Sequence, residues 1–490
     1  MQQPSEICQL SATTLTEHLR SRKLSSVEVV TAFLDRIETI NPVVNAIINL
    51  RERNDILHDA KMADALASRG QVKGPLHGLP IAIKDLALTQ GLATTFGSPI
   101  FRSFVPDADE YHVARIKAAG AIVVGKTNVS EFGLGSNTYN QIFGSTKNAF
   151  NQSLIAGGSS GGAAVALATS MVPIADGSDM GGSLRNPAAY NNIYGFRPSQ
   201  GRVPSGPQPE SFLSQMATDG PLGRTVADLA LLLSVQAGYH RHSPLSLDGS
   251  LSSQIERSEL QQRETRVAWL GSLGGHLPLE DGILTLCEAA LRRAAEIGWR
   301  VDEVVPGFDY ESLWQAFVVL RQSTSGAALA THRFNREHWA MLKPEAQWEV
   351  EGALKLTALD VFAASTVRTG WYRTVTSLTE KYDLLVLPTA QVFPFDVQTH
   401  WPAEIAGRKM DSYHRWMEVT VHATMAGCPA ISVPVGFDAR GVPMGMQLIG
   451  APRTDSAVLR AAARHESITP FGGGLQYGNS RQSSNTETAV

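Results

Sequence analysis

Cysteine is scarce in this chain of 490 residues, which contains only three: Cys8, Cys287 and Cys428. An odd and widely spaced set does not make a disulfide framework, and no CxxC pair suggests a structural zinc site. We therefore expect free thiols and a reducing compartment, the cytoplasm.

Long hydrophobic runs are missing as well. Segment 1–10 is polar and has no basic stretch followed by an apolar one, so no secretory signal peptide is expected. The longest apolar stretch, 163–175, is interrupted by Thr169, Ser170 and Pro173 and cannot cross a bilayer. No association with a membrane is predicted.

Neither sign of charge is in large excess, because the formal net charge is only -4. That value is too small to attract nucleic acid, so no nucleic-acid partner is expected. Hydrophobic residues make up 43% and charged residues 18% of the chain, which is typical of a globular protein and not of a disordered one.

No linker rich in proline or serine divides the chain, so we expect a single domain over residues 1–475. The stretch 308–382 has helical patterns and several tryptophans, and we interpret it as a helical insertion packed on the domain. The polar stretch 240–264 is typical of a surface excursion. Residues 476–490 are polar and are expected to form a C-terminal tail.

Patterns typical of strands and helices alternate along the chain. Short apolar runs that indicate strands occupy residues 79–83, 121–124, 172–175, 266–270, 299–305, 384–387, 430–435 and 444–449. Helical patterns occupy residues 25–37, 113–119, 163–168, 225–237, 282–297 and 413–425. The first helix has the capping-box spacing of Ser25 and Glu28, and Pro42 is expected to end it. The alternation predicts an α/β fold in which a large mixed central β-sheet is covered by helices on both faces.

The most informative segment is 157–198, where serines are embedded in two glycine clusters, 157–162 and 177–183. Glycine permits positive φ and close approach of a substrate to the backbone, and successive N–H groups in such a loop can form an anion-binding nest. An exposed serine beside a nest supplies a nucleophile and an oxyanion hole, which are two parts of acyl-transfer chemistry.

Three other interpretations of this segment compete. A flexible linker is disfavoured because helix and strand patterns follow each cluster and because Asp179 and Arg185 interrupt it. A phosphate loop would need Gly-Lys-Ser/Thr after the glycines. Residues 157–161 do match the G-x-S-x-G nucleophile elbow of hydrolases with a Ser-His-Asp triad, which remains a rival on the motif alone. An elbow needs a strand directly before it, however, and residues 147–155 are polar.

The whole segment resembles the defining stretch of the amidase signature family. The likeness rests on both glycine clusters and on Ser183-Leu184-Arg185 followed by Pro187-Ala188. It extends to the segments 78–85, 125–128, 195–198 and 429–450 and covers nearly the whole chain. The resemblance implies the amidase signature fold. It also implies a serine amidohydrolase that converts a carboxylic amide to an acid and ammonia or an amine.

The resemblance further implies a Ser-cisSer-Lys triad made of Ser183, Ser159 and Lys84. Ser183 would attack the carbonyl and form an acyl-enzyme, Ser159 would relay the proton, and Lys84 would be the base. The residues support the base independently. Lys84 ends the apolar run 80–83, where burial disfavours the ammonium form and lowers the pKa of a lysine. Asp85, its neighbour, points to the opposite face of the strand and cannot easily neutralise it.

Four backbone N–H groups are expected to hold the oxyanion, those of Met180, Gly181, Gly182 and Ser183. By resemblance, Asp179 and Arg185 order the active-site loop, and a plain ion pair between them is an equally good interpretation. Ser160 is a further supporting residue, and either Ser159 or Ser160 could instead be the N-cap of the following helix. Asp176 stands where the family usually has a small or apolar residue, and the sequence assigns it no role.

No metal or cofactor is expected, because His240, His242 and His422 are not spaced as a metal site. The expected partner is a small-molecule amide, and a homodimer is left open. Four aromatic residues are candidates for an apolar pocket, although core packing is their commoner fate: Tyr139, Trp314, Trp371 and Trp416.

Two alternatives to a free-standing amidase remain. One is the amidase-type subunit of a glutamine-dependent tRNA amidotransferase, which would need partner subunits. The chain lacks an added basic domain, and Phe196-Arg197 stands where that subunit class usually has Leu-Lys. The other is an esterase or carbamate hydrolase on the same scaffold.

Overall fold

The computed structural model describes residues 4–249, 251 and 264–469. Its strands are β1 (Ile47–Ile48), β2 (Pro80–Lys84), β3 (Ile122–Thr127), β4 (Ile174–Asp179), β5 (Tyr194–Arg197), β6 (Thr218–Gly223), β7 (Thr265–Trp269), β8 (Trp299–Glu303), β9 (Leu384–Pro388), β10 (Glu404–Ile405), β11 (Arg408–Lys409), β12 (Ala430–Phe437) and β13 (Pro443–Ile449).

The α-helices are α1 (Pro4–Gln9), α2 (Ala12–Arg20), α3 (Ser26–Val44), α4 (Arg53–Ser68), α5 (Tyr111–Ala118), α6 (Gly161–Ala168), α7 (Arg185–Tyr190), α8 (Val226–Gln236), α9 (Ile283–Ala294), α10 (Tyr310–Arg321), α11 (Ala327–Leu329), α12 (Arg336–Met341), α13 (Pro344–Ala353), α14 (Ala358–Thr379), α15 (Glu418–Ala426) and α16 (Asp455–Ser467). Shorter helical turns are η1 (Pro99–Phe101), η2 (Glu131–Gly133), η4 (Ala295–Ile297), η5 (Gln322–Gly326), η6 (Ala330–Phe334) and η7 (Arg415–Met417).

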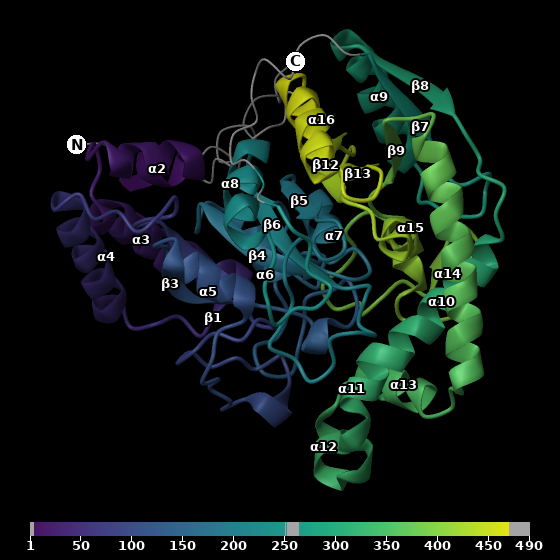
Figure 1. The fold of residues 1–490 in the computed structure, drawn as a ribbon, viewed down its shortest axis with the longest axis horizontal. Coiled ribbons are helices and arrows are strands. Elements are labelled where there is room, and N and C mark those ends of the chain that lie inside the picture. Colours follow the sequence, from purple (N-terminus) through teal and green to yellow (C-terminus); the bar gives the residue numbers. More distant parts are fainter. Residues whose placement is uncertain (1–3, 250, 252–263, 470–490) are drawn as a thin grey trace, which may run out of the picture.

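One mixed sheet has 11 strands in the order β1-β3-β2-β4-β6-β5-β12-β13-β9-β7-β8. It runs through the molecule, with most of its strands labelled in Figure 1. Strand β2 is parallel to β3 and β4, and β7 is parallel to β8 and β9. The other neighbouring pairs in this sheet are antiparallel. The predicted α/β fold with a large mixed sheet is confirmed.

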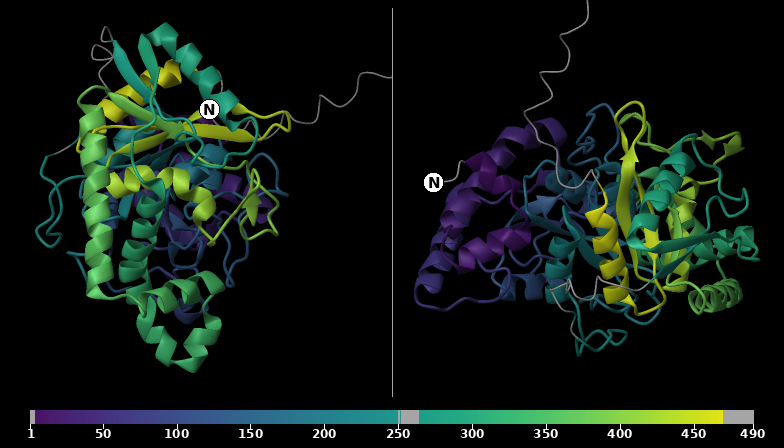
Figure 2. Two further views of the ribbon diagram at one scale, coloured as in Figure 1. Left: turned by 90° about the vertical axis from the view of Figure 1, so that its right-hand side faces the viewer. Right: turned by 90° about the horizontal axis from the view of Figure 1, so that it is seen from above.

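Strand β9 shows how helices cover both faces of the sheet (Figures 1 and 2). Leu384 and Val386 pack with residues of α9 and α16. Leu385 and Leu387 pack on the other side with residues of α10, α14 and α15. Because successive side chains of a strand point to opposite faces, a strand covered on both sides must be apolar throughout, which explains the unbroken apolar run.

The predicted end of the first long helix is wrong. Helix α3 continues through Pro42 to Val44, and Asn45 follows it with a left-handed φ of 53°. Proline removes one N–H and therefore only one hydrogen bond of the ladder. The next turn still closes, because the Asn45 N–H donates to the Asn41 carbonyl at 2.8 Å.

The stretch 308–382 is helical, as expected, and includes α10 to α14. Helices α10 and α14 pack side by side along one end of the sheet (Figure 2). Trp314 and Trp371 are buried in the core between this insertion and the sheet, and Trp416 is buried in the neighbouring core cluster. Core packing is therefore the role of these three tryptophans.

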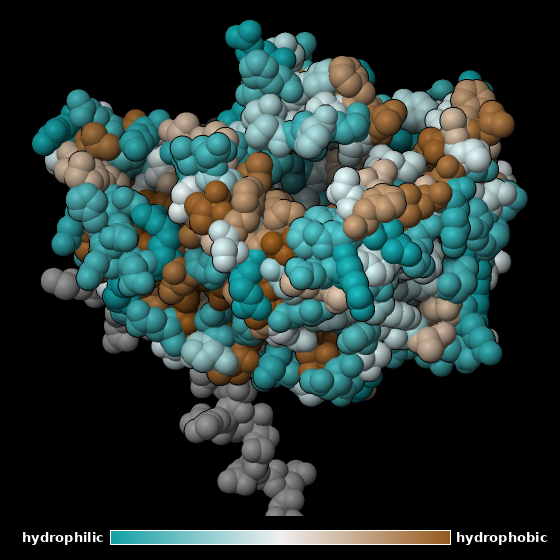
Figure 3. Space-filling view, turned by 90° about the horizontal axis from the view of Figure 1, so that it is seen from below, coloured by the Kyte–Doolittle hydropathy of each residue, from teal (hydrophilic) through white to brown (hydrophobic). Residues whose placement is uncertain are grey.

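Cys8, Cys287 and Cys428 are free and buried, which agrees with the absence of a disulfide framework. In the described part of the chain, no helix is long and apolar enough to cross a membrane. Figure 3 shows one face of the molecule, on which hydrophilic and apolar side chains are interspersed. The predicted C-terminal tail, 476–490, and most of the stretch 240–264 lie outside the described residues.

Candidate active site

Parallel pairing of β2 and β4 brings the site together. Ile81 pairs with Ile174 and Ala82 with Ala175, so the carboxyl ends of both strands lie at the same edge of the sheet. Lys84 is the last residue of β2 and is fully buried. The loop that follows β4 carries Ser183 and therefore begins beside this lysine.

Lys84 and Ser159 are in direct contact. The Nζ atom of Lys84 lies 2.9 Å from Ser159 Oγ and 2.7 Å from Ser160 Oγ. A third hydroxyl, that of Ser178, lies 2.9 Å from the same nitrogen. The peptide bond between Gly158 and Ser159 is cis, as the family resemblance implied. The lysine amine is thus enclosed by serine hydroxyls, and no carboxylate of the described residues is in contact with it.

Burial lowers the pKa of Lys84 to about 7, although the charges of Asp219, Asp176 and Asp179 act in the opposite direction. The expectation about Asp85 is confirmed. Its carboxylate accepts hydrogen bonds from the backbone N–H and the hydroxyl of Thr95, on the other side of the strand. Because a neutral amine can accept a proton, Lys84 has the properties of a general base near neutral pH.

Ser183 lies near this group and is 6% exposed. Its carbonyl accepts the backbone N–H of Ser160 at 3.3 Å, which links the nucleophile loop to the start of α6. The hydroxyls of Ser159 and Ser183 are not hydrogen-bonded to one another in this structure. This second link of the relay stays a prediction.

The carboxylate of Asp179 organises the loop around Ser183. It accepts the backbone N–H groups of Gly182, at 3.0 Å, and Leu184, at 3.2 Å. It also accepts two hydrogen bonds from Arg185, at 3.0 Å from Nε and 2.9 Å from Nη2. Burial alone would raise the pKa of Asp179, but Arg185 and Arg197 hold it well below its usual range. The structure therefore shows the ion pair between Asp179 and Arg185 together with hydrogen bonds from the loop to Asp179, and the supporting role in catalysis stays a prediction.

The hydrogen bonds of Asp179 distinguish between the four backbone amides that are expected to hold the oxyanion. The N–H of Gly182 is already donated to Asp179. The geometry therefore favours the amides of Met180, Gly181 and Ser183 as oxyanion donors.

Gly182 has a backbone that only glycine adopts easily, with a φ of +101°. A Cβ atom at this position would lie 2.5 Å from Thr420 Oγ1, on buried helix α15. We expect Gly182→Ala to reduce kcat by about a hundredfold or more, because the loop must shift and the oxyanion donors shift with it. Steady-state rates of the purified variant measure this.

Gly70→Ala is the matched control, because Gly70 has a φ of +73° but no atom within 4 Å of the added Cβ. It should lose about 1 kcal/mol of stability and keep full activity. Equal losses of activity in both variants would contradict the role of the clash.

Apolar side chains lie against the nucleophile loop. A Cβ at Gly181 would lie 2.9 Å from Met417 Cε and 3.6 Å from Phe317 Cζ. Met417 and Phe317 are both buried. On the other side, Met180 Sδ lies 3.2 Å from Nη1 of Arg321. The helical insertion and η7 therefore form the immediate surroundings of the loop.

The competing nucleophile elbow is not supported by the local structure. Residues 156–160 follow an irregular segment, in which Leu154 forms only an isolated bridge with Asp396. Ser159 contacts a lysine rather than a histidine. Ser160 does occupy the N-cap position of α6, but its hydroxyl contacts Lys84 and makes no capping hydrogen bond.

Sequence reasoning missed three residues beside Lys84, namely Ser178, His112 and Asp219. Asp176, which had no assigned role, accepts the backbone N–H of Lys84 at 2.8 Å and lies 3.3 Å from Nε2 of His112. Asp176 and Ser178 are two positions apart on β4, so their side chains point to the same face of the sheet. This spacing of two residues is visible in the sequence.

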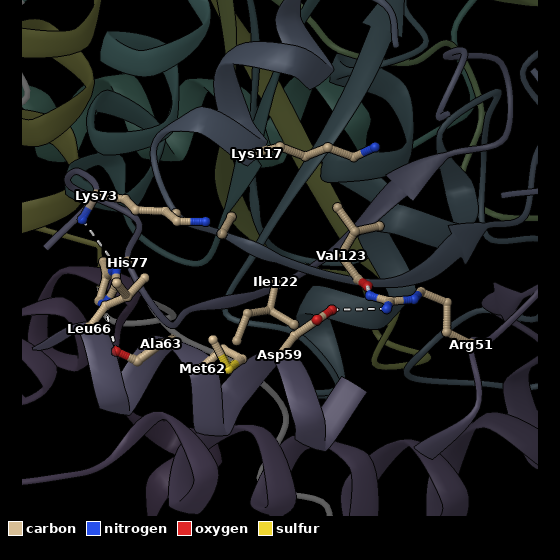
Figure 4. A pocket seen from close by; sticks show the side chains of 12 residues that line it. Arg51, Asp59, Met62, Ala63, Leu66, Lys73, His77, Lys117, Ile122 and Val123 are labelled. Atoms are coloured by element: carbon tan, nitrogen blue, oxygen red, sulfur yellow. Dashed lines mark hydrogen bonds and ion pairs between the residues drawn. The ribbon is translucent and has the colours of Figure 1, made fainter. Parts of the chain in front are cut away.

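The other residues singled out in the sequence lie elsewhere. His422 is buried in α15, while His240 stacks on Tyr111 with ring centroids 3.9 Å apart. A pocket between α4 and β3 is lined by residues that include Arg51, Asp59 and His77 (Figure 4). It contains none of the expected catalytic residues.

Known proteins resemble this chain over most of its length. A family model described as Amidase matches residues 28–459. The acylamidase of Rhodococcus erythropolis is 35% identical over 466 residues, which cover 94% of this chain and 96% of that protein. A glutamyl-tRNA(Gln) amidotransferase subunit from Thermus thermophilus is 34% identical over 485 residues, which cover 93% of this chain and 97% of that protein.

The crystal structure of a bacterial aryl acylamidase matches with a TM-score of 0.88 and 30% identity, covering 94% of this chain and 96% of that one. Fold, site and relatives together define a hydrolase that acts on amide bonds. The chain belongs to the amidase signature family, as its sequence predicted.

Proposed function

We propose that the chain is a serine amidohydrolase that cleaves a carboxylic amide through an acyl-enzyme on Ser183. The observation that carries the proposal is the contact of 2.9 Å between Lys84 Nζ and Ser159 Oγ in a buried site. A lysine whose pKa burial lowers to about 7 is partly neutral at neutral pH, so it can accept a proton from this serine.

In the acylation step, Lys84 takes the proton of Ser159 while Ser159 takes that of Ser183. The Ser183 oxygen attacks the carbonyl carbon, and the resulting oxyanion is bound by loop amides. The proton then passes back through Ser159 to the leaving nitrogen, which departs as ammonia or an amine when the C–N bond breaks. In deacylation, water gives a proton to the same relay while its oxygen attacks the ester carbon. The bond between this carbon and the Ser183 oxygen then breaks, the relay returns the proton to Ser183, and the acid is released.

The substrate carries an apolar group next to the amide. Met417 and Phe317 lie against the backbone at Gly181, on the loop that would hold the oxyanion. An apolar acyl or aryl group that packs there removes apolar surface from water, about 25 cal/mol for each Å² buried. The names of two relatives, an acylamidase and an aryl acylamidase, support the same class.

One component of a tRNA amidotransferase is the second candidate, because relatives of that description match the chain at 34% identity. Such a component works together with partner chains and glutamine, whereas an amidase needs neither. An esterase or carbamate hydrolase on this scaffold is the third candidate, because both would use the same nucleophile and base.

We expect the isolated chain to hydrolyse an apolar anilide or acyl amide without partner subunits, glutamine or ATP. A panel containing an anilide, a primary amide, the matching ester and the matching carbamate measures this by release of amine, ammonia or alcohol. Activity that requires added subunits would establish the amidotransferase alternative. Hydrolysis of the ester or the carbamate with no amide turned over would contradict the amidase assignment.

A further inference from the structure

A cluster of buried and half-buried titratable groups near Lys84 has no part in the steps described so far. His112, on α5, is fully buried. Its Nε2 lies 3.3 Å from Asp176 Oδ2, and its Nδ1 lies 3.8 Å from Asp219 Oδ2. Glu110 precedes α5 and brings a third carboxylate, so that atoms of Glu110, His112 and Asp219 lie within 4.8 Å of one another.

The two aspartates that flank His112 also face Lys84. Asp176 Oδ1 accepts the Lys84 backbone N–H at 2.8 Å. Asp219 is directly opposite Ser178 in the β4–β6 ladder, and Ser178 Oγ lies 2.9 Å from Lys84 Nζ. Because residues paired in a ladder share one face of the sheet, Asp219 lies on the face of the lysine amine. Of the nearby charges, that of Asp219 opposes the lowering of the Lys84 pKa most strongly.

This arrangement poses a problem for a lysine base. Carboxylates close to a lysine favour its ammonium form, which cannot accept a proton. A second cation that pairs with the same carboxylates has the opposite effect, because it cancels their charge and repels a positive charge on the lysine. Burial already lowers the Lys84 pKa against these carboxylates, and such a cation would favour the neutral amine further.

His112 has the contacts and the charge to be that cation. Burial lowers its pKa, but the carboxylates of Asp219, Asp176 and Glu110 outweigh this and raise the pKa to about 9. Its Nδ1 is buried and makes no hydrogen bond, while the nearest carboxylate oxygen belongs to Asp219. An imidazolium has a proton on each nitrogen, so each proton faces one of the two aspartates.

We propose that His112 is a positioning residue: as an imidazolium held between Asp176 and Asp219, it neutralises these two carboxylates and leaves Lys84 as the uncharged base. The proposal rests on the proposed function of Lys84. It assigns a role to Asp176, the residue that departs from the usual family pattern. His112 itself touches neither the nucleophile nor the lysine amine.

The remaining charges around the cluster do not replace His112. Burial lowers the pKa of Lys126, on β3, to about 8, and its Nζ donates to the carbonyl of Ala87 and the hydroxyl of Thr89. Of the carboxylates, Asp85 raises the pKa of Lys126 most strongly, ahead of Asp176 and Glu110. Burial and the charge of Asp219 raise the pKa of Glu110, which disfavours its ionised form.

Asp179, the third carboxylate that acts on Lys84, has its own counter-ions. Arg185 donates two hydrogen bonds to it, and Arg197 Nη1 lies 3.3 Å from Asp179 Oδ1. Its charge is therefore already compensated. Asp176 and Asp219 are the carboxylates that depend on His112.

The experiment compares the pH profile of kcat/KM for wild type, His112→Gln and Asp219→Asn on one amide substrate. In the wild type, kcat/KM should rise with pH around pH 7 because Lys84 loses its proton there. We call this part of the profile the rising limb. We expect His112→Gln to move this limb to higher pH by about one unit, with about fivefold less activity at pH 7 and a similar plateau above it. Asp219→Asn should move the limb to lower pH, because a charge that favours ammonium is lost.

The opposite signs separate an electrostatic role from a structural one. A merely structural residue would lower the plateau in both variants and leave the limb in place. The double variant His112→Gln/Asp219→Asn should return the limb to within about half a unit of wild type. Limbs that move in the same direction, or that do not move in either variant, would overturn the proposal.

His77→Gln is the matched control, because His77 is also buried but contacts Ala63 on α4, in the pocket of Figure 4. It should leave the limb unchanged. If His112→Gln does not fold, Asp219→Asn still tests the proposal, because the direction in which its rising limb moves can be measured alone. Asp219 is only partly buried, so this variant should fold. A wild-type profile without any limb near pH 7 would instead count against Lys84 as the base, and so against the proposed function itself.

A final arm tests whether a metal ion rather than a proton lies between His112 and the carboxylates. Wild-type enzyme dialysed against EDTA should keep its activity and its rising limb. Loss of activity that added Zn²⁺ restores would overturn the imidazolium assignment, because the cation balancing Asp219 would then be the metal.

Discussion

Ser183→Ala is expected to lower kcat by about 10⁴-fold or more on every amide that the wild type hydrolyses. The change removes the oxygen that attacks the carbonyl, and Lys84 and Ser159 then have only a water molecule to activate. Binding and the oxyanion amides remain, which is why some acceleration over water should persist. Initial rates measure the loss, and rapid-mixing experiments should show no burst of released amine.

The control for this variant is Ser153→Ala. Ser153 is exposed, and its hydroxyl contacts only the nearby Asn151, at 2.7 Å. Both variants should unfold within about 2 °C of the wild type, since neither change removes packed apolar atoms. If Ser183→Ala kept more than about a hundredth of the wild-type rate, another nucleophile, with Ser159 the first to test, would have to replace Ser183.

The alternation of strands and helices could be predicted from sequence because each signal is local. Strand β9 is an apolar run of five residues, all of them buried. Strand order is different, because it depends on which edges meet in space. Nothing in the sequence of residues 80–84 indicates that β2 lies between β3 and β4. Pro42 shows a related limit of prediction from the sequence. A proline in the last turn of a helix removes only one backbone hydrogen bond, which is too little to end the helix.

The residues of the proposed triad could be picked out from the sequence, but their surroundings could not. Lys84, Ser159 and Ser183 lie within motifs whose residue types and spacing are specific. His112 and Asp176 are 64 positions apart, and nothing local marks them as partners. Likewise, the use of the Gly182 amide by Asp179 is a detail of loop geometry. Contacts between distant segments are set by sheet pairing and therefore require the structure.

Lys84→Met is expected to lower kcat/KM by about three orders of magnitude and to abolish the rising limb near pH 7. General-base catalysis typically contributes about 10²- to 10⁴-fold, and methionine has a similar length but no basic atom. The pH profile between about pH 5 and 9 measures both effects. Lys61→Met, a change at an exposed residue of α4, should leave the rate and the limb unaltered.

Stability provides a readout of the same lysine that does not depend on activity. Its pKa is about 7 in the folded chain, against 10.5 for an unperturbed lysine. Between these values the unfolded chain binds a proton that the folded chain does not, so this group makes the wild type more stable as pH rises, by about 1.4 kcal/mol per unit. Below pH 7 both states are protonated and the group contributes a constant cost.

Lys84→Met lacks this dependence. The free energy of unfolding of the wild type, minus that of the variant, should therefore increase by roughly 2 kcal/mol between about pH 7.5 and pH 9. Denaturant unfolding at several pH values measures this difference. A constant difference would mean that Lys84 is an ordinary ammonium ion in the folded chain. In that case the same amine could not serve as the base for Ser183, whatever the loss of activity in the variant.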